Sequence, residues 1–241
     1  TKTPQLDRML TDIAPIITKK TQLLVLSNGL GNIEVIEKHV ARNQILAGVT
    51  LWTSTLVKPG EIHTTGSGSI KLQAIGNADA APVAAALNEA GLNVEITQDV
   101  LTAIWHKAGI NSVLNPLSVL LNANIAEFGT AGNGMDLALQ ILDEIQKVGA
   151  TQGVKVDITG IMNDLTNLLK PENAGNHYPS MYQDIQNGKR TEIDFLNGFF
   201  AKIGRQEQIA TPFNSLVTAL VHAKEDIERV KVAKKQETFE I

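Results

Sequence analysis

Apolar runs of strand length occur only in the first hundred residues of this chain. They lie at 21–27, 44–54, 61–64, 69–74 and 94–97, with helical patterns over 6–17, 33–40 and 78–90. After Gln98 the apolar residues recur at helical spacing instead, over 99–121, 133–150, 157–169, 191–208 and 213–230. Such a change marks a domain boundary. We therefore expect an α/β domain over 1–98, an all-helical domain over 99–230 and a frayed polar tail over 231–241.

The first long apolar run has the sequence context of a buried parallel strand. Residues 21–27 end in Asn28-Gly29-Leu30-Gly31, and helical spacing resumes at Ile33. Strand, glycine turn and helix make up the βαβ unit, in which ligands bind at the carboxyl ends of strands. Glu34 occupies the place of the third glycine of a dinucleotide fingerprint, so a tight turn accounts for Gly29 and Gly31. Asn28 is the candidate ligand contact. Further along, 61–64 and 69–74 are expected to pair as a hairpin around Gly66-Ser67-Gly68.

Composition excludes several classes of protein. The chain has 241 residues, 43% of them hydrophobic, and a net charge of −4, which argues against a nucleic-acid surface. It has no cysteine, so disulfides are excluded. No apolar run approaches the roughly 20 residues of a membrane-spanning helix. The five histidines show no paired metal-ligand spacing, so no metal site is expected.

The segment Ile104–Pro116 carries the clearest candidate site. Lys107, Asn111 and Asn115 follow one another at i, i+4 and i+8, which places them on one side of a helix. One cation and two amides could bind an anionic, oxygen-rich small molecule. The alternative is an ordinary solvated face, which is the usual setting of a lysine. Apolar residues on both flanks favour an interior position. Pro116 strains the helix at Asn115, because proline lacks a backbone donor.

Two further segments carry candidate residues. Residues 191–200 are expected to begin a helix with Thr191 as a capping residue, and with Glu192 and Asp194 in the first turn. Ser180 follows Pro179 without the Gly-x-Ser-x-Gly motif of a hydrolase. It could cap a helix over 181–186 or belong to a site.

Taken together, these segments resemble the ketopantoate reductase (2-dehydropantoate 2-reductase) family. The matching segments, in family order from Thr1 to about Lys224, are Thr1-Lys2-x-x-Gln5, Asn28-Gly29-Leu30-Gly31, Trp105-His106-Lys107-x-x-x-Asn111-x-x-x-Asn115-Pro116-Leu117, Ser180-Met181-Tyr182-Gln183-Asp184 and Thr191-Glu192-Ile193-Asp194-Phe195-Leu196-Asn197-Gly198. The combination of the lysine-asparagine helix with the Thr-Glu-Ile-Asp segment is specific to the family.

The resemblance implies a fold and a reaction. The fold is an α/β Rossmann-type NADP domain followed by an all-α domain like that of 6-phosphogluconate dehydrogenase. The reaction is reduction of 2-dehydropantoate to pantoate by NADPH, in pantothenate and coenzyme A synthesis, by a cytoplasmic enzyme that could form a homodimer through its helical domain. The implied roles are as follows: Lys107 is the proton donor and Glu192 the active-site glutamate, which also lies near the cofactor; Asn111, Asn115, Ser180 and Asn28 bind substrate; and Lys2, Asn28 and Ser54 contact the cofactor.

Two departures from the family pattern qualify these expectations. The family's first strand, its Gly-x-Gly-x-x-Gly turn and the strands that follow are absent, so we expect an N-terminal part to be missing and the chain as given to be inactive. Ile125 aligns with a substrate-binding asparagine of the family, and Asn122 or Asn124 could replace it. Two alternatives stay open: a paralogue that reduces another 2-oxo acid or an imine, and a non-catalytic binding or assembly domain.

Overall fold

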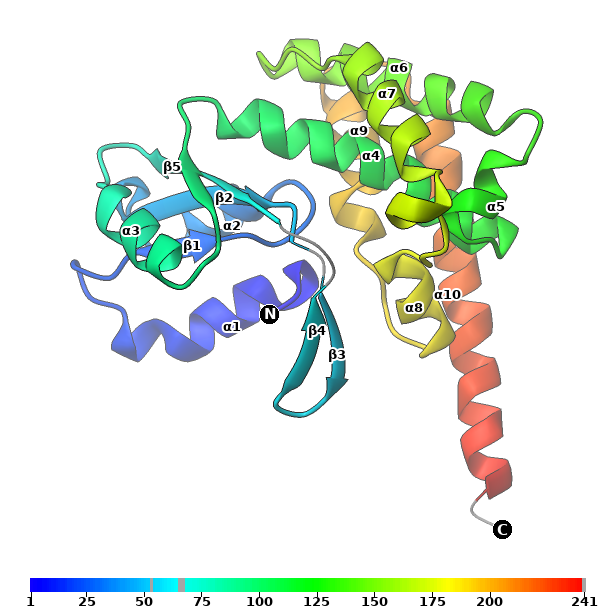
Figure 1. The fold of residues 1–241 in the computed structure, drawn as a ribbon, viewed down its shortest axis with the longest axis horizontal. Helices are drawn as coiled ribbons and strands as arrows, with labels where there is room; N and C mark the ends of the chain where they lie inside the picture. The colour runs from blue at the N-terminus through cyan, green and yellow to red at the C-terminus, as the bar shows by residue number, and fades with distance from the viewer. Residues whose placement is uncertain (53, 65–67, 240–241) are drawn as a thin grey trace. The chain divides into compact units, whose positions relative to one another are not determined.

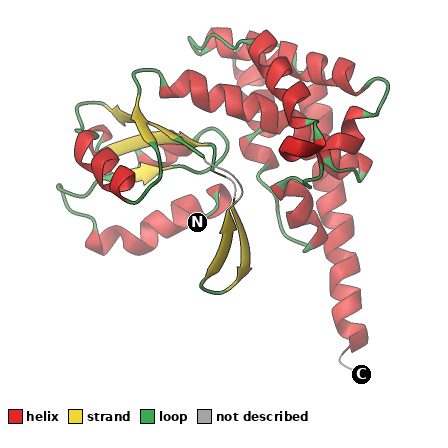
Figure 2. Ribbon diagram, in the orientation of Figure 1, coloured by secondary structure: helices red, strands yellow, loops and turns green. Residues whose placement is uncertain are grey.

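The computed structural model describes residues 1–52, 54–64 and 68–239, and the chain divides into two compact units, Thr1–Ile104 and Trp105–Ile241 (Figures 1 and 2). The division falls inside helix α4 (Val100–Leu121) rather than just before it. Residues Gly66 and Ser67, named in the expected hairpin, lie outside the described residues. In the part of the chain that is described, no helix is both long and apolar enough to cross a membrane.

The first unit is built on a mixed four-stranded sheet. The strand order is β1-β2-β5-β6, with β1 parallel to β2, β2 antiparallel to β5, and β5 parallel to β6. The parallel β1–β2 pair agrees with the parallel strand expected at 21–27. The bounds are η1 Thr3–Gln5, α1 Leu6–Ile13, η2 Ala14–Ile16, β1 Leu23–Val25, α2 Asn32–Ile36, η3 Arg42–Gln44, β2 Ile45–Thr50, β3 Ser54–Lys58, β4 Glu61–Thr64, β5 Ile70–Ile75, α3 Ala81–Glu89 and β6 Val94–Ile96.

The hairpin of this unit differs from the expected one. Strand β4 pairs antiparallel with β3, as a separate two-stranded sheet, and β5 pairs with β2 instead. Gly60, with a φ of +81°, lies in the tight turn that joins β3 to β4, a conformation that glycine adopts at no steric cost. The long strand expected at 44–54 is therefore two strands, and Ser54 begins the hairpin instead of ending a strand of the main sheet.

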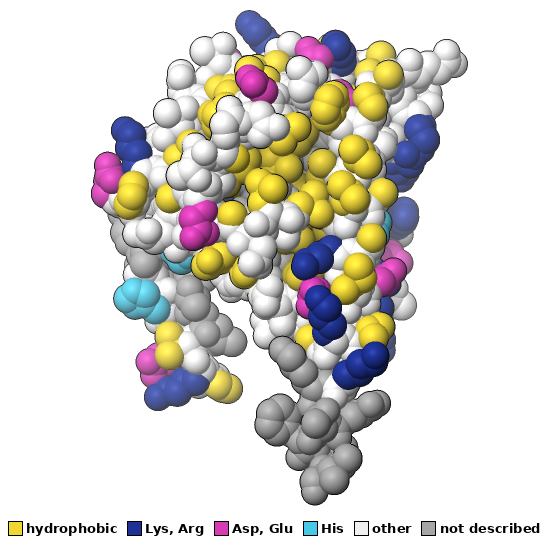
Figure 3. All heavy atoms as spheres, turned by 90° about the vertical axis from the view of Figure 1, so that its right-hand side faces the viewer, with side chains coloured by type: hydrophobic (Ala, Val, Ile, Leu, Met, Phe, Trp, Pro, Cys, Tyr) yellow, Lys and Arg dark blue, Asp and Glu magenta, His cyan; other side chains and the backbone are white. Residues whose placement is uncertain are grey.

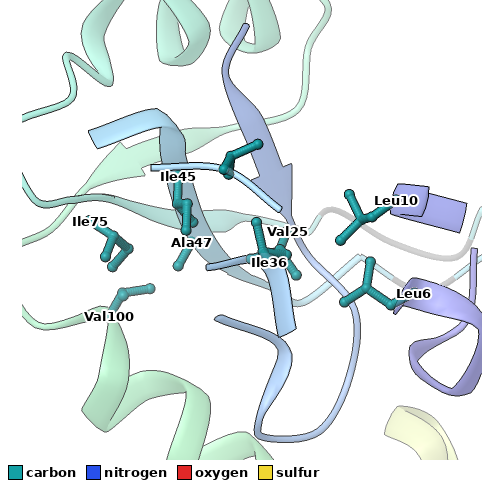
Figure 4. Packing of buried hydrophobic residues seen from close by; sticks show 9 residues of the cluster. Leu6, Leu10, Val25, Ile36, Ile45, Ala47, Ile75 and Val100 are labelled. Carbon is teal, nitrogen blue, oxygen red and sulfur yellow. The ribbon is translucent and has the colours of Figure 1, made fainter. Parts of the chain in front are cut away.

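Side chains alternate across the sheet and form two apolar layers. Ile45 and Ala47 of β2 pack with Leu6, Leu10 and Ile36 of α1 and α2 on one face (Figure 4). Leu46, between them in sequence, packs with Ala80 and Ala84 at the start of α3 on the other face. The first turn of α4 belongs to this unit, because Val100 joins the first cluster and its N–H donates to the Gln73 side chain at 2.8 Å.

The second unit consists of helices and connecting loops, with no strand among its described residues. Helix α4 is buried over most of its length after Trp105, which is why its sequence lacks a strong polar face. The remaining elements are α5 Ile125–Gly129, α6 Gly134–Thr151, α7 Ile158–Leu168, the π-helical turn η4 Pro171–Gly175, α8 Ser180–Gln186, η5 Ile193–Phe195, α9 Asn197–Gln206 and α10 Pro212–Phe239.

Two expectations for this unit differ from the structure. The helix expected over 191–208 is interrupted at Leu196, whose φ of −118° and ψ of −108° are not helical, so the α-helix begins only at Asn197. The tail expected from residue 231 continues α10 as far as Phe239. Lysine and glutamate are good helix formers, and Lys231 pairs with Glu228 at 2.8 Å. The polar residues of this segment therefore continue the helix.

Gly48 supplies a test of how closely the sheet is packed. A Cβ added there would lie 2.6 Å from Leu26 Cδ2 and 2.9 Å from the Lys71 carbonyl oxygen. Because the backbone oxygen has no room to move, we expect Gly48→Ala to lower the free energy of unfolding by about 1–3 kcal/mol. Thermal melts followed by circular dichroism measure the loss. Gly132→Ala, where nothing lies within 4 Å, is the control. Equal melting temperatures of Gly48→Ala and Gly132→Ala would contradict the close packing at Gly48.

Candidate active site

Lys107, Asn111 and Asn115 lie along one side of helix α4 and form a strip. The helix runs without interruption through all three residues, so the i, i+4, i+8 spacing places them on one side. Lys107 and Asn111 are half-buried and Asn115 is 8% exposed, while Ala108 and Leu114 beside them are buried. The alternative of a solvated polar face does not agree with this burial. The strip is a partly enclosed surface with one cation and two amides.

Glu192 acts on the charge of Lys107. Burial lowers the pKa of the Lys107 ammonium below its ordinary value, and the negative charge of Glu192 opposes part of that shift. Glu192 is itself half-buried and directly precedes η5. Of the predicted site residues, these two are therefore brought together. A lysine whose pKa lies below its usual range, with a carboxylate beside it, can hold a proton and also release it.

The backbone around Glu192 is held by a carboxylate from α10. Thr191 is buried, and its N–H donates to Glu225 Oε1 at 2.7 Å. The Thr191 hydroxyl accepts the N–H of Ile193 at 3.3 Å. The polypeptide is thus fixed on both sides of Glu192. This arrangement corrects the expectation that Thr191 caps an α-helix with acids in its first turn, because a 3-10 turn follows and the α-helix starts only at Asn197, six residues later.

Glu225 also contacts Arg190 and His222. Arg190 Nη1 donates to its Oε2 at 2.6 Å, and His222 Nδ1 lies 3.1 Å from the same oxygen. The second ring nitrogen of His222 lies 2.9 Å from Asp194 Oδ1. Burial alone would raise the pKa of Glu225, but the bonds from Arg190, Thr191 and His222 hold it below its ordinary value. Sequence reasoning missed Glu225, although His222 and Glu225 at i, i+3 on one helix face gave a partial signal.

Ser180 and Ile125 occupy different settings. Ser180 is the first residue of α8 and is exposed, with Pro179 at the cap position and no side-chain cap, so it is not a capping serine. Ile125 is 6% exposed. Asn124 caps α5 by accepting the Glu127 N–H at 2.8 Å, and Asn122 accepts the Tyr182 hydroxyl at 2.8 Å. Both asparagines therefore have structural partners, which argues against either replacing the family asparagine.

In the first unit, the loop after β1 brings Asn28 next to the chain's first residues. The Asn28 carbonyl accepts the Thr3 hydroxyl at 2.9 Å, so Lys2, which precedes Thr3 in the sequence, lies close to this loop. Gly29 and Gly31 have φ values of +87° and +86°, which keep the loop free of Cβ atoms where the backbone turns. Ser54, exposed in the separate hairpin, is not on the strand that carries this loop.

Two family descriptions match separate parts of the chain. Residues 1–77 match the family description "Ketopantoate reductase PanE/ApbA", and residues 99–225 match "Ketopantoate reductase PanE/ApbA C terminal". The 2-dehydropantoate 2-reductase of Lactococcus lactis is 37% identical, with 96% of this chain and 75% of the relative covered. That of Streptococcus pyogenes is 40% identical, with 96% and 76% covered.

A solved structure gives the same fold. A ternary structure of D-mandelate dehydrogenase with NADH and anilino(oxo)acetate is 39% identical, with 95% of this chain and 75% of that chain covered and a TM-score of 0.91. Likeness of this extent covers both the Rossmann-type sheet and the helical unit, each as expected from the sequence. The chain belongs to the ketopantoate reductase family of oxidoreductases.

Proposed function

We propose that the protein reduces 2-dehydropantoate to pantoate with NADPH, in the synthesis of pantothenate and coenzyme A. The observation that carries the proposal is the α4 strip, where a lysine of lowered pKa shares one helix side with two amides and is acted on by Glu192. Membership of the family, and relatives at 37% and 40% identity with the name 2-dehydropantoate 2-reductase, support the choice of substrate.

The strip suits the charge that develops during ketone reduction. A reduced nicotinamide supplies hydride to the ketone carbon, and the carbonyl π electrons move to the oxygen. The Lys107 ammonium stabilises the negative charge there and then transfers its proton, which completes the alcohol. Asn111 and Asn115 bind the carboxylate and the hydroxyl of the substrate, with Ser180 as a further contact. Glu192 keeps Lys107 protonated before the transfer.

The loop after β1 suits a dinucleotide. It lies at the carboxyl end of a strand in a parallel pair, where open α/β sheets bind ligands. Its two left-handed glycines let the backbone approach a ligand closely. We assign Asn28 and Lys2 of this unit to the cofactor.

A second candidate is the reduction of a 2-oxo acid with an apolar or aromatic side chain, by NADH. The likeness at 39% identity to a D-mandelate dehydrogenase, solved with NADH, favours it. Ile125 also favours it, because it occupies the place of a substrate-binding asparagine of the family and its side chain cannot form a hydrogen bond.

A substrate and cofactor panel tests the proposal. Oxidation of NADPH and of NADH is followed at 340 nm with 2-dehydropantoate and with phenylglyoxylate, using the enzyme expressed from its complete gene. We expect the highest kcat/KM for 2-dehydropantoate with NADPH. A higher value for phenylglyoxylate with NADH would establish the second candidate instead, and turnover of neither acid would refute both.

The pH dependence of kcat tests the role of Lys107. Reduction needs the protonated lysine, so kcat should be constant at pH values below the Lys107 pKa and fall as the pH rises through it. Glu192→Gln removes the charge that raises this pKa, so the fall should move to lower pH. Lys107→Ala should lower kcat by about 10²–10⁴-fold.

The matched control is Glu172→Gln, the same chemical change at an exposed carboxylate of the helical unit. It should leave the pH profile of kcat in place. An unchanged profile in Glu192→Gln, or near-normal turnover in Lys107→Ala, would refute the assignment of Lys107 as the proton donor.

We also propose that the helical unit forms a homodimer through α10. Leu216, Leu220, Ala223, Ile227 and Val230 are exposed at intervals of four, three, four and three residues, which is the seam spacing of paired helices. The large members are 44–58% exposed. Figure 3 views the side on which α10 lies in Figure 1, and shows apolar side chains gathered on that face.

The spacing of these residues on α10 is self-complementary. Leu216 and Val230 lie seven residues to either side of Ala223, so two antiparallel copies that cross at Ala223 would place leucine of one against valine of the other. The small alanine lets the two helices approach closely. A two-fold interface requires such a self-complementary patch, because the same surface is used by both copies.

Charge introduced into this patch should separate the copies. We expect the wild-type chain to have the mass of a dimer by light scattering on a sizing column, and Leu220→Glu/Ile227→Glu to have that of a monomer, because a carboxylate buried in an apolar interface lacks a partner. Thr159→Glu, on an exposed position of α7, is the control and should remain dimeric. A monomeric wild type, or a dimeric double variant, would exclude this interface.

A further inference from the structure

Pro116 removes a hydrogen-bond donor from the interior of α4. In an unbroken helix the N–H of residue 116 would donate to the carbonyl of Ser112, and proline has no N–H. Ser112 is 0% exposed, so water cannot supply the missing donor at the surface. A buried carbonyl without a partner is costly, and native structures nearly always provide one.

Asn197 provides the missing donor. Its Nδ2 donates to the Ser112 carbonyl oxygen at 3.0 Å, across 85 residues of sequence. Asn197 is the first residue of α9 and is 0% exposed. The side-chain amide of one segment thus replaces a main-chain donor of another, within the same unit.

Asn197 is itself fixed by a buried network. It donates a second bond to Asn214 Oδ1 at 3.0 Å, and Asn214 Nδ2 donates to Glu144 Oε2 at 2.7 Å. Glu144 accepts the N–H groups of Phe213 and Asn214 at 2.8 and 2.9 Å, so its carboxylate lies at the N-terminus of α10, where the helix dipole favours an anion. Residues of α4, α6, α9 and α10 therefore meet in one set of hydrogen bonds.

The bond joins the two segments that carry the proposed catalytic pair. Ser112 lies on α4 between Asn111 and Asn115, five residues after Lys107, and Asn197 follows the 191–196 segment that carries Glu192. We propose that Asn197 is a positioning residue, which uses the carbonyl freed by Pro116 to hold the Lys107 strip in register with Glu192. This inference rests on the proposed function, because it concerns the same reductase site.

The proposal gives Asn197 and Pro116 a measurable dependence on each other. Asn197→Ala leaves the Ser112 carbonyl without its donor. Pro116→Ala restores a main-chain N–H at the place where a helix supplies one. Asn197 should therefore matter much less when residue 116 is alanine, and a double-mutant cycle measures this coupling.

The experiment compares four full-length proteins: wild type, Asn197→Ala, Pro116→Ala and the double variant. For Asn197→Ala we expect kcat to fall by about 10–10²-fold, because small misplacements of reacting groups have effects of this size. The alkaline fall of kcat should also move to lower pH, because Glu192 is the charged group that acts on Lys107 and would lie further from it. The double variant should recover most of the lost kcat and the wild-type pH profile.

Ser118→Ala is the matched control on the same helix. Ser118 is 0% exposed, and its hydroxyl has no hydrogen-bond partner within the described residues, so its removal should change neither kcat nor the pH profile. A general loosening of α4 would change kcat and its pH profile in Ser118→Ala and in Asn197→Ala alike. A purely structural role of Asn197 would lower the yield or the melting temperature but leave the pH profile in place.

Each outcome decides a different question. Absence of turnover in the wild type on every substrate of the panel refutes the proposed function; the inference is then judged by hydrogen exchange of the α4 amides, which should be faster in Asn197→Ala and restored in the double variant. Active wild type with an unchanged pH profile in Asn197→Ala overturns the inference alone, as does an equal loss of kcat in both backgrounds. Should Asn197→Ala fail to fold, Asn197→Ser, whose hydroxyl is too short to reach Ser112, takes its place in the cycle.

Discussion

The helical unit depends on how buried polar groups of α4 find partners. Lys107 is held in a setting that disfavours its charge, and the carboxylate of Glu192 acts against that penalty. One turn further along, the Ser112 carbonyl loses its helical donor to Pro116 and regains one from Asn197. Both partners come from residues 192–197, which include η5 and the first residue of α9, so that segment and α4 fold as one structure. The remaining helices pack around these polar groups and exclude water from them. The groups therefore need partners within the protein.

The strip on α4 was predictable from sequence because a helix fixes the angle between residues four apart, whatever surrounds it. Lys107, Asn111 and Asn115 needed only a helix to become neighbours. The stretch that begins at Thr191 was not predictable in the same way. Its backbone conformation depends on Glu225, 34 residues away from Thr191, and on non-helical dihedral angles at Leu196. The residues around Leu196 do not indicate such a turn. Local spacing therefore gave half of the site, and long-range hydrogen bonds determined the rest.

The first unit shows the same division. The strand-turn-helix around Asn28 could be predicted from the sequence, because two glycines after an apolar run indicate a tight turn. The partner of β4 does not, since a strand of four residues can pair with either neighbour along the chain. Pro59-Gly60, a dipeptide typical of turns, lies between β3 and β4. Its consequence, the pairing of β3 with β4 and the position of Ser54, required the whole sheet to be known.

Helix α10 has consequences for how this protein can diverge. One of its sides holds Glu144's partner Asn214 and the buried Glu225, and the other exposes the row from Leu216 to Val230. A helix with two constrained sides offers little neutral surface to mutation. Divergence among relatives should therefore concentrate at exposed charged positions such as Arg229 and Lys231. The pattern of tolerated change along this helix would record both of its faces, without any measurement of activity.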